Sequence, residues 1–335
     1  MNRFDAMKKN IVSVIIGLLI GIVLIILWSA TIDINYLIQS LSKVNSLNIV
    51  LAGMFYIIAY AVRSYRWNLL LRKQIHLTFK ESWLISAAGN WLNYLIPIRA
   101  GEVIKAILIR KLKKKSAVSV MPSIFIDKFF DTIGIFFVLI LIPFVNIRIS
   151  NGLNILIFLL ILMFIALFFV LILAATNKKR ITGILQVMFS WLPQRIRTKI
   201  NNLIDIFIQG LNIFDHHYSV IIYSVLLTAL GVILDSVYFF MIFKAFNIEI
   251  NYFIVLFGYT LINLSYILPQ PPAQLGSNEW MMIIIFSLGF GLTRNIASTI
   301  MVFAHLFTAC IITALGIIGF SYAGMKSLKQ IQREL

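Results

Sequence analysis

A proline-broken apolar run occurs twice in this chain, and it limits the possible folds more than any other feature. The segment from Tyr94 to Pro97 is Tyr-Leu-Ile-Pro, and the segment from Tyr266 to Pro269 is Tyr-Ile-Leu-Pro. An Asn precedes each run, and a Gly and then a Glu follow it. Proline lacks a backbone donor and clashes with the preceding turn, so it ends or kinks a helix. The repeat therefore predicts two broken helices in apolar, helical surroundings.

The composition places these broken helices in a membrane. Of the 335 residues, 61% are hydrophobic and only 12% are charged. This predicts an all-α polytopic membrane protein rather than a soluble domain. The net charge of +17 indicates cytoplasmic loops rich in Lys and Arg, and no nucleic-acid partner is expected. A single cysteine, Cys310, leaves no disulfide within the chain.

Six apolar stretches are long enough to cross a bilayer, which takes about 20 residues. The predicted transmembrane spans are 10–32, 45–62, 116–145, 149–176, 218–243 and 295–325. Segment 177–217 mixes basic and apolar residues, which is typical of helices lying in the cytoplasmic membrane interface. The whole chain, 1–335, is predicted to be a single membrane domain.

Two further apolar stretches predict re-entrant segments, which enter and leave the membrane on the same side. The stretch 82–98 has cations at both ends, and at about 1.5 Å per residue it barely matches a hydrocarbon core of roughly 30 Å. The stretch 250–291 contains Pro269, Pro271 and Pro272. One continuous helix cannot carry three prolines so close together without losing backbone hydrogen bonds.

The distribution of basic residues predicts the topology. With both termini in the cytoplasm, most of the 29 Lys and Arg lie on the cytoplasmic side of the six predicted spans, as the positive-inside rule requires. The first re-entrant segment then enters from the cytoplasm and the second from outside. Segments 45–145 and 218–325 would form an inverted-topology repeat, which is typical of secondary transporters. The expected location is the cell membrane.

Charged residues inside the third predicted span form the main candidate polar site. Asp127, Lys128 and Asp131 begin roughly 18 Å from its basic edge, if the span is helical. Charges at such depth are usually paired and line a polar cavity. The candidate partners near the first break are Arg99, Glu102, Lys105 and Arg110. Alternatively, Asp127 and Lys128 only tie this span to the first re-entrant segment as a structural ion pair.

Two acids in the second half are candidate proton-coupling residues. Glu279 follows the second break as Glu102 follows the first, although it could instead cap the helix that starts at Trp280. Asp235 is the lone acid of the fifth predicted span, and it is either a proton site or a hydrogen-bonded packing residue. His305, which stands alone among apolar residues, is interpreted as structural. We expect no metal site and no cofactor.

The motifs of this chain resemble those of one family. They are Pro97-x-Arg99-x-Gly101-Glu102, Lys105, Asp127-Lys128-x-x-Asp131 and Pro269-x-x-Pro272-x-x-x-Gly276-x-x-Glu279. Over nearly its whole length the chain resembles the lysylphosphatidylglycerol synthase transmembrane family, a flippase-like membrane domain. It departs from the family pattern at Lys105, Asp127-Lys128 and Ala273-Gln274, where Arg, Glu-Arg and Gly-Gly are common.

The resemblance implies a flippase-like transporter that moves a phospholipid or related polar-headgroup lipid, aminoacylated in the family, between leaflets. A polar groove between the two re-entrant segments would carry the headgroup. Multi-domain members add a cytosolic transferase, which this chain, ending at Leu335, lacks, so transport without synthesis is implied. A membrane lipid is the expected substrate, and a separate lipid-modifying enzyme and a homo-oligomer are open as partners. The predicted groove residues are Asn90, Asn93, Pro97, Arg99, Gly101, Glu102, Lys105, Asp127, Lys128, Asp131, Pro269, Pro272, Gly276, Asn278 and Glu279.

Two other functions stay open on the sequence. One is a membrane enzyme of the glycosyltransferase type that acts on a lipid-linked substrate, although the predicted outside loops are short and carry only Asp33 and Glu249. The other is a membrane partner protein that transports nothing. The sequence contains no P-loop, no HExxH motif and no nucleophile elbow. Transport is therefore expected to be downhill or coupled to an ion.

Overall fold

The computed structural model is helical throughout the regular elements that it describes. It describes residues 3–72, 74–96, 101–142, 150–176, 218–266 and 270–324, with short pieces at 193–194, 196–198, 201–202 and 205–206. The elements are α1 (Arg3–Ser29), α2 (Ile34–Leu41), α3 (Ser46–Leu71), α4 (Phe79–Leu95), α5 (Gly101–Lys113), α6 (Ala117–Leu141), α7 (Asn151–Thr176), α10 (Tyr218–Ala245), α11 (Tyr252–Ser265), η3 (Pro272–Gln274), α12 (Ser277–Met282), η4 (Ile283–Gly289) and α13 (Arg294–Tyr322).

The described helices make a multi-pass membrane protein. By length and composition, α3, α10 and α13 can cross a membrane, and the pair α1 and α2, bent by 91°, gives a fourth span if it is counted as one. Helix α6 is as long, with 25 residues, but it carries Asp127, Lys128 and Asp131 in its middle. The predicted total of six spans therefore stays a prediction.

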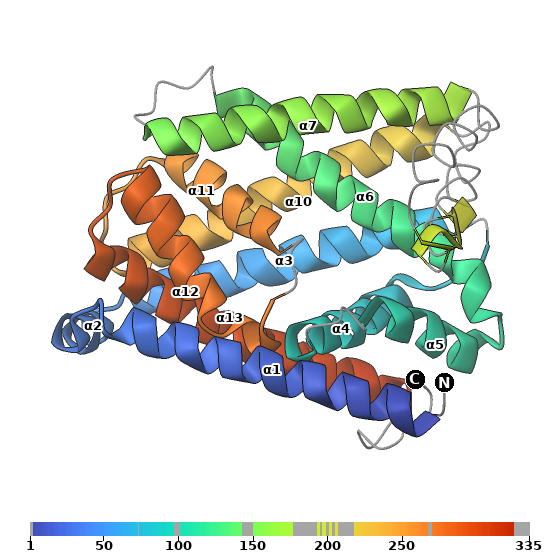
Figure 1. Ribbon diagram of the computed structural model, residues 1–335, viewed down its shortest axis with the longest axis horizontal. Helices are drawn as coiled ribbons and strands as arrows, with labels where there is room; N and C mark the ends of the chain where they lie inside the picture. Colours follow the sequence, from blue (N-terminus) through green and yellow to red (C-terminus); the bar gives the residue numbers. More distant parts are fainter. Residues whose placement is uncertain are drawn as a thin grey trace.

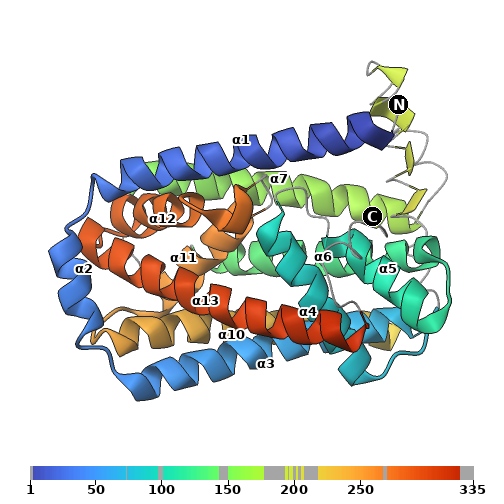
Figure 2. The same cartoon turned by 90° about the horizontal axis from the view of Figure 1, so that it is seen from below.

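The long helices lie lengthwise in the molecule, and two hairpins of shorter helices enter from opposite ends (Figure 1). Helices α4 and α5 form the first hairpin, and α11 and α12 form the second (Figure 2). The end of α4 and the start of α12 both lie toward the middle of the molecule (Figure 2). The start of α1 and the end of α13 lie at the same end as the outer part of the first hairpin (Figure 1).

Each hairpin packs against a long helix from the other half of the chain. Helix α4 packs along α13, whereas α11 packs against α6. Helices α3 and α10 lie side by side (Figure 2), and the amide of Asn45 at the start of α3 donates a 2.8 Å hydrogen bond to the carbonyl of Ala245 at the end of α10. Helix α4 of the first hairpin therefore rests on α13, and helix α11 of the second rests on α6, while the inverted repeat itself stays a prediction.

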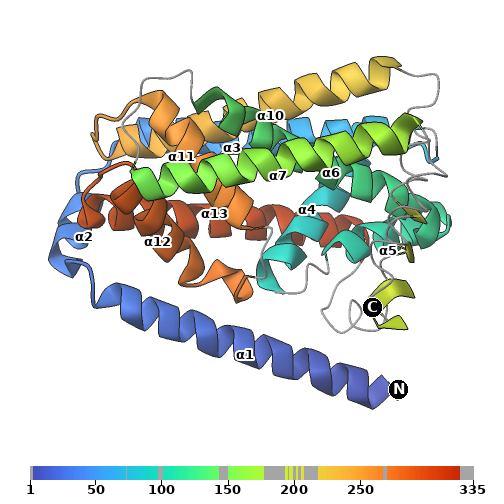
Figure 3. The ribbon, with the colours of Figure 1, turned by 45° about the horizontal axis from the view of Figure 1, so that its top comes forward.

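Helix α1 runs along one side of the molecule and contacts the second hairpin (Figure 3). Two glycines allow this approach. A Cβ added to Gly21 would lie 3.2 Å from the carbonyl oxygen of Leu275, and one added to Gly276 would overlap the side chain of Leu24. Gly276 also has a φ of 75°, which favours glycine. The turn before α12 is therefore anchored on α1.

The hydrophobic side chains serve both an interior and a lipid-facing surface. One buried cluster, which includes Phe239 and Phe286, joins α10, α11, η4 and α13, and a second, which includes Trp67, joins α3 to the first hairpin. Outward-facing residues are also apolar: Phe158 of α7 is 66% exposed and Leu226 of α10 is 59% exposed. Large exposed apolar surfaces of this kind mark contact with a membrane.

Two boundaries differ from those predicted. The second predicted span ended at residue 62, but α3 continues to Leu71, so Arg63 and Arg66 belong to the helix instead of a cytoplasmic loop. The basic stretch after the first break, counted among the loops, forms the helix α5. The prediction was wrong because it ended a span at the first charge, although a helix continues where its charges find partners. Predicted segment 177–217 lies almost entirely outside the described residues.

A capping box closes the outer end of the first hairpin. Thr78 and Glu81 exchange hydrogen bonds at the start of α4, and Glu81 forms a 2.7 Å ion pair with Lys113 at the end of α5. Partial burial works against ionisation, but the hydrogen bond from Lys113 and the backbone amide of Thr78 lower the pKa of the Glu81 carboxyl. The two arms of the hairpin are thus joined at their outer ends.

Candidate functional site

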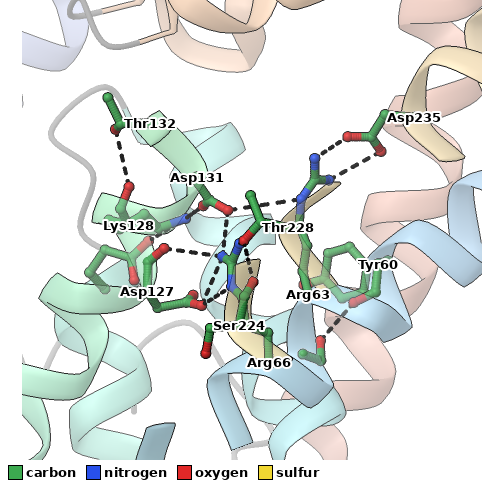
Figure 4. A network of polar contacts seen from close by, with 12 residues as sticks. Tyr60, Arg63, Arg66, Asp127, Lys128, Asp131, Thr132, Ser224, Thr228 and Asp235 are labelled. Atoms are coloured by element: carbon green, nitrogen blue, oxygen red, sulfur yellow. Dashed lines mark hydrogen bonds and ion pairs between the residues drawn. The ribbon is translucent and has the colours of Figure 1, made fainter. Parts of the chain in front are cut away.

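A buried arginine near the end of α3 connects three helices in the interior of the molecule. Arg66 is 1% exposed, and its Nε lies 2.9 Å from Asp127 Oδ1 of α6. Its Nη2 lies 2.5 Å from Asp131 Oδ1, and its Nη1 donates a 2.7 Å hydrogen bond to the Thr228 hydroxyl of α10. Figure 4 shows these three contacts converging on one guanidinium. A charge this deep is stable only because each donor finds a partner.

A second arginine, one turn earlier, reaches the acid of α10. Arg63 donates two hydrogen bonds to Asp235, one of them 3.1 Å long from Nη1 to Oδ1. Its Nε also lies 4.0 Å from Asp131, so Arg63 bridges two acids (Figure 4). Asp235 is therefore a hydrogen-bonded residue and not a lone acid. Its role in proton coupling stays a prediction.

The first hairpin joins these charges through its own glutamate. Glu102 at the start of α5 lies 3.1 Å from Lys105 Nζ and 3.4 Å from Lys128 Nζ of α6. Lys105 is 3% exposed and its ammonium lies over the Trp67 ring at 5.3 Å. Gly89 of α4 makes room for it, since a Cβ there would lie 2.7 Å from Lys105 Cγ.

Together these contacts form one continuous network, in which Lys128 also binds Asp131 at 3.2 Å. Its bases are Arg63, Arg66, Lys105 and Lys128, and its acids are Glu102, Asp127, Asp131 and Asp235. We call it the charge network. The four positive charges equal the four negative charges in number, so the buried groups compensate one another and no large net charge is left inside the membrane.

An asparagine closes the inner end of the first hairpin. The Asn93 side chain accepts a 2.8 Å hydrogen bond from the Gly101 amide and donates a 3.0 Å hydrogen bond to Glu102. Asn90, one turn earlier on α4, faces the Tyr60 hydroxyl of α3. Both asparagines therefore position the hairpin.

Gly101 is required where the two arms of the first hairpin cross. A Cβ on this residue would overlap the carbonyl oxygen of Gly89 and would lie 2.7 Å from the Asn93 side chain. Backbone cannot move aside as a flexible side chain can, so we expect Gly101→Ala to lower the free energy of unfolding by about 1–3 kcal/mol. The measurement is reversible unfolding in mixed detergent micelles.

Gly152→Ala is the matched control for this substitution. Gly152 lies in α7 with no atom within 4 Å of a Cβ placed on it. Because alanine favours helix over glycine, the control should be neutral or stabilising by up to about 1 kcal/mol. Equal stability of the Gly101→Ala and Gly152→Ala proteins would contradict the close crossing of α4 and α5.

The tip of the second hairpin contains a separate ionisable pair. Glu279 of α12 is 3% exposed, and its Oε1 lies 2.6 Å from Nδ1 of His305 on α13. The other ring nitrogen, Nε2, lies 2.7 Å from the Ala273 carbonyl oxygen and 3.0 Å from the Tyr94 hydroxyl of α4. His305 thus holds the two hairpins together. Glu279 lies in the first turn of its helix, but its hydrogen-bond partner is His305 and not a backbone amide.

The other predicted residues of the second break shape this tip. Pro272 is buried in the turn η3, Gly276 packs on α1, and Asn278 donates a 2.9 Å hydrogen bond to Gln274. Ala273 and Gln274 adopt φ values of 54° and 56°. The turn therefore has a left-handed backbone at two residues that are not glycine.

The two sites meet at neighbouring residues of α4. Asn93 binds Glu102 of the charge network, and Tyr94 binds His305 of the second hairpin. The structure thus connects most of the predicted residues into one polar region. Pro97, Arg99 and Pro269 lie outside the described residues.

Four residues were predicted as partners of the α6 charges, and the structure describes three of them, Glu102, Lys105 and Arg110; Arg99 lies outside the described residues. Neither described base of that set pairs with the acids, because Arg66 is the direct partner of both Asp127 and Asp131. Arg110 is exposed, and Lys105 binds Glu102. Of the expected set, Glu102 contacts α6 by binding Lys128. The alternative prediction was that Asp127 and Lys128 tie this helix to the first hairpin by an ion pair, and the structure shows such a pair for Lys128.

Sequence reasoning missed three residues, Arg63, Arg66 and His305. The apolar pattern of α3 continues through Trp67 to Leu71, and this continuation was the signal that both arginines are helical and inward-facing. His305 was interpreted as isolated, and no pattern in the sequence connects it to Glu279, which lies on another helix.

Comparison with known proteins agrees with this architecture. Residues 14–316 match the family model described as the lysylphosphatidylglycerol synthase TM region. A UPF0104 membrane protein of Methanothermobacter thermautotrophicus is 21% identical over 89% of this chain and 91% of its own length. A second UPF0104 membrane protein, from Methanocaldococcus jannaschii, is 24% identical over 93% of this chain and 95% of its own length. The likeness therefore extends over nearly the full length of all three chains.

Proposed function

Because the chain belongs to the lysylphosphatidylglycerol synthase transmembrane-region family, we propose that it is a flippase-like transporter of membrane lipids. It would move a phospholipid or related polar-headgroup lipid between the leaflets of the cell membrane. In this proposal the chain has six spans, two re-entrant hairpins and cytoplasmic termini. The start of α1 and the end of α13 lie at the same end of the molecule, which supports termini on one side.

The observation that carries the proposal is the reciprocal packing of the two hairpins. The first rests on α13 and the second on α6, and their tips are joined through His305, which contacts both Tyr94 of α4 and Ala273 of η3. Broken helices that meet between two opposed halves are how many secondary transporters build a substrate site. Rocking one half against the other would open the site to each leaflet in turn.

The charge network would provide the polar side of the headgroup path. All four of its bases are paired, and Arg66 and Lys105 are buried, but 40% of the Lys128 side chain is exposed. We propose that Lys128, together with Arg99, binds a lipid phosphate by charge-assisted hydrogen bonds. Arg66 and its acids would instead hold α3, α6 and α10 in register. No covalent chemistry is assigned to any of these residues.

The proposed transport needs an energy source or a downhill gradient. Glu279 and Asp235 are the candidate proton carriers, and they differ in their surroundings. Asp235 has two hydrogen bonds from Arg63. Glu279 has one oxygen bound to His305, and its other oxygen is buried with no partner in the described part of the chain. Glu279 is therefore the stronger candidate for coupling.

A transport assay tests the proposal. In proteoliposomes, the inward movement of phosphatidylglycerol with a fluorescent acyl chain is measured by back-extraction into albumin. We expect Glu279→Gln and Arg99→Ala each to slow the protein-dependent rate at least tenfold, because one loses a charge at the tip and the other a phosphate ligand.

Glu249→Gln provides the matched control, since Glu249 is exposed and outside both sites. The control should transport at the rate of the unaltered protein. Unchanged rates in both Glu279→Gln and Arg99→Ala would remove these residues from the mechanism. A complete absence of protein-dependent movement with any lipid tested would refute the transport function.

A further inference from the structure

A cavity lies between the α1–α2 bend and the tips of both hairpins. Its volume is about 360 Å³, and its lining includes Ile25, Trp28, Leu306, Tyr94, Glu279 and His305. Leu306 is 64% exposed, so the cavity reaches the lipid-facing side of α13. The volume is near the lower end of ligand pockets, which run from roughly 300 to 1,000 Å³. It suits one alkyl chain with a small polar group better than a two-chain lipid.

The polar end of this cavity holds a proton between two side chains. Nε2 of His305 lies 2.7 Å from the Ala273 carbonyl oxygen, which can only accept, so Nε2 carries a hydrogen. The 2.6 Å contact between Nδ1 and Glu279 Oε1 also requires a hydrogen, whichever atom carries it. The pair is therefore neutral overall, either as imidazolium and carboxylate or as imidazole and carboxylic acid.

The chemistry of the lining selects a positive group. Among the lining residues the only acid is Glu279, and none is a Lys or Arg. Both nitrogens of His305 are already engaged, so they offer no donor to an anion. Glu279 Oε2 is buried and has no hydrogen-bond partner among the described residues, and a buried acceptor without a partner costs free energy that a donor on a ligand would recover.

The remaining titratable groups near Glu279 do not change this preference. Tyr94 of α4 and Tyr266 at the end of α11 face the pair, and neither is a base. The part of α1 with described side chains, from Ile15 to Ser29, contains no titratable residue. A cation that enters the cavity and displaces the shared proton therefore meets one carboxylate, and the lining contains no Lys or Arg that would compete with it.

We propose that this cavity binds a single-chain amphiphile with a primary ammonium group, in exchange for the proton shared by Glu279 and His305. The alkyl chain lies against Ile25, Trp28 and Leu306, and the ammonium donates to Glu279. One ammonium enters and one proton leaves, so the net charge of the buried site stays at zero. After the exchange Glu279 is a carboxylate and His305 is a neutral imidazole with its hydrogen on Nε2. The inference rests on the proposed transport function, to which it adds a ligand class and a one-for-one exchange with protons.

Binding of decylammonium to the full chain in phosphatidylcholine nanodiscs tests this inference. Titrations in weakly buffered solution with a pH indicator should show saturable binding and release of one proton per ammonium bound. Empty nanodiscs give the partitioning background. Octylammonium should bind about 16-fold more weakly, because each methylene contributes about fourfold. Decyl sulfate should show no saturable binding, since no free base faces the cavity.

Variants locate the site. Glu279→Gln should weaken decylammonium binding at least tenfold and abolish proton release, whereas Glu249→Gln should bind like the unaltered protein. Val302→Phe fills part of the cavity without altering the acid, and it should weaken decylammonium more than octylammonium. This second variant and the decyl sulfate titration keep the test decisive if Glu279→Gln does not fold.

The results distinguish a lipid headgroup amine from a single-chain amine as the ligand. They also distinguish failure of this site from failure of the proposed transport function. Phosphatidylethanolamine nanodiscs that displace decylammonium would assign the site to a lipid headgroup amine, and no displacement would assign it to a single-chain amine. Binding without proton release, equal binding of decyl sulfate, or an unaffected Glu279→Gln would overturn the inference. If decylammonium does not bind but lipid transport still depends on Glu279, the transport function stands and this site does not.

Discussion

Replacing Arg66 with leucine should destabilise the protein by about 3–5 kcal/mol, the largest effect that we expect from a single substitution. Arg66 is buried and binds Asp127, Asp131 and Thr228. Without it, the buried Asp127 has no direct base among the described residues, and Asp131 keeps only Lys128 and the more distant Arg63 among them. Breaking a buried pair costs more than the pair contributes, because a charge is left unpaired in a medium of low dielectric. The measurement is the free energy of unfolding in mixed detergent micelles.

Arg72→Leu is the matched control, because Arg72 follows the same helix α3 and is exposed. It should change the free energy of unfolding by no more than about 0.5 kcal/mol. Adding Asp127→Asn to Arg66→Leu should recover part of the lost stability, since the unpaired carboxylate is then removed. If Arg66→Leu is no less stable than Arg72→Leu, the charge network does not hold α3, α6 and α10 together.

The Arg63 and Asp235 pair should show strong coupling in a double-mutant cycle. Arg63→Leu and Asp235→Leu are each expected to cost about 3 kcal/mol, at the lower end for broken buried pairs. We expect a cost at the lower end because 35% of the Arg63 side chain is exposed and water weakens the ion pair, although only 5% of the Asp235 side chain is exposed. The double substitution should lie within about 1 kcal/mol of the unaltered protein, since two apolar residues leave no charge without a partner.

The cycle gives a coupling free energy, which we expect to exceed about 2 kcal/mol. Pairing Arg63→Leu with Glu249→Leu is the control, because Glu249 is exposed and lies in the loop after α10. Those two effects should add within about 0.5 kcal/mol. Additive effects of Arg63→Leu and Asp235→Leu would show that the two side chains do not depend on one another.

Most of the helical framework could be predicted from the sequence. Long uncharged runs identified the long helices, because the hydrocarbon core admits only helices whose backbone is fully bonded. Pro97 indicated the first broken segment and the three clustered prolines the second. The end of α3 was placed too early, at residue 62 instead of Leu71. A charged residue marks the edge of a membrane span only when its side chain is hydrated. Arg66 is instead paired with two acids, so the helix continues past it.

The identity of the buried acids was visible in the sequence, but their partners were not. Asp127, Asp131, Asp235 and Glu279 stand out because acids are rare in apolar runs. Pairing joins residues that are far apart in the chain, such as Arg63 with Asp235. No local periodicity records which of several nearby bases will lie within hydrogen-bond reach.

By itself the sequence determined that this chain lies in a membrane, that its helices break at two matching positions, and that acids are buried among them. These properties follow from the composition and from the chemistry of proline, and they do not depend on how the helices pack against one another. Only the tertiary structure decided that Arg66 compensates Asp127 and Asp131, and that His305 joins Glu279 to the first hairpin through Tyr94. The physical reason is that electrostatic energy depends steeply on distance in a low dielectric, and those distances are set by how the helices pack.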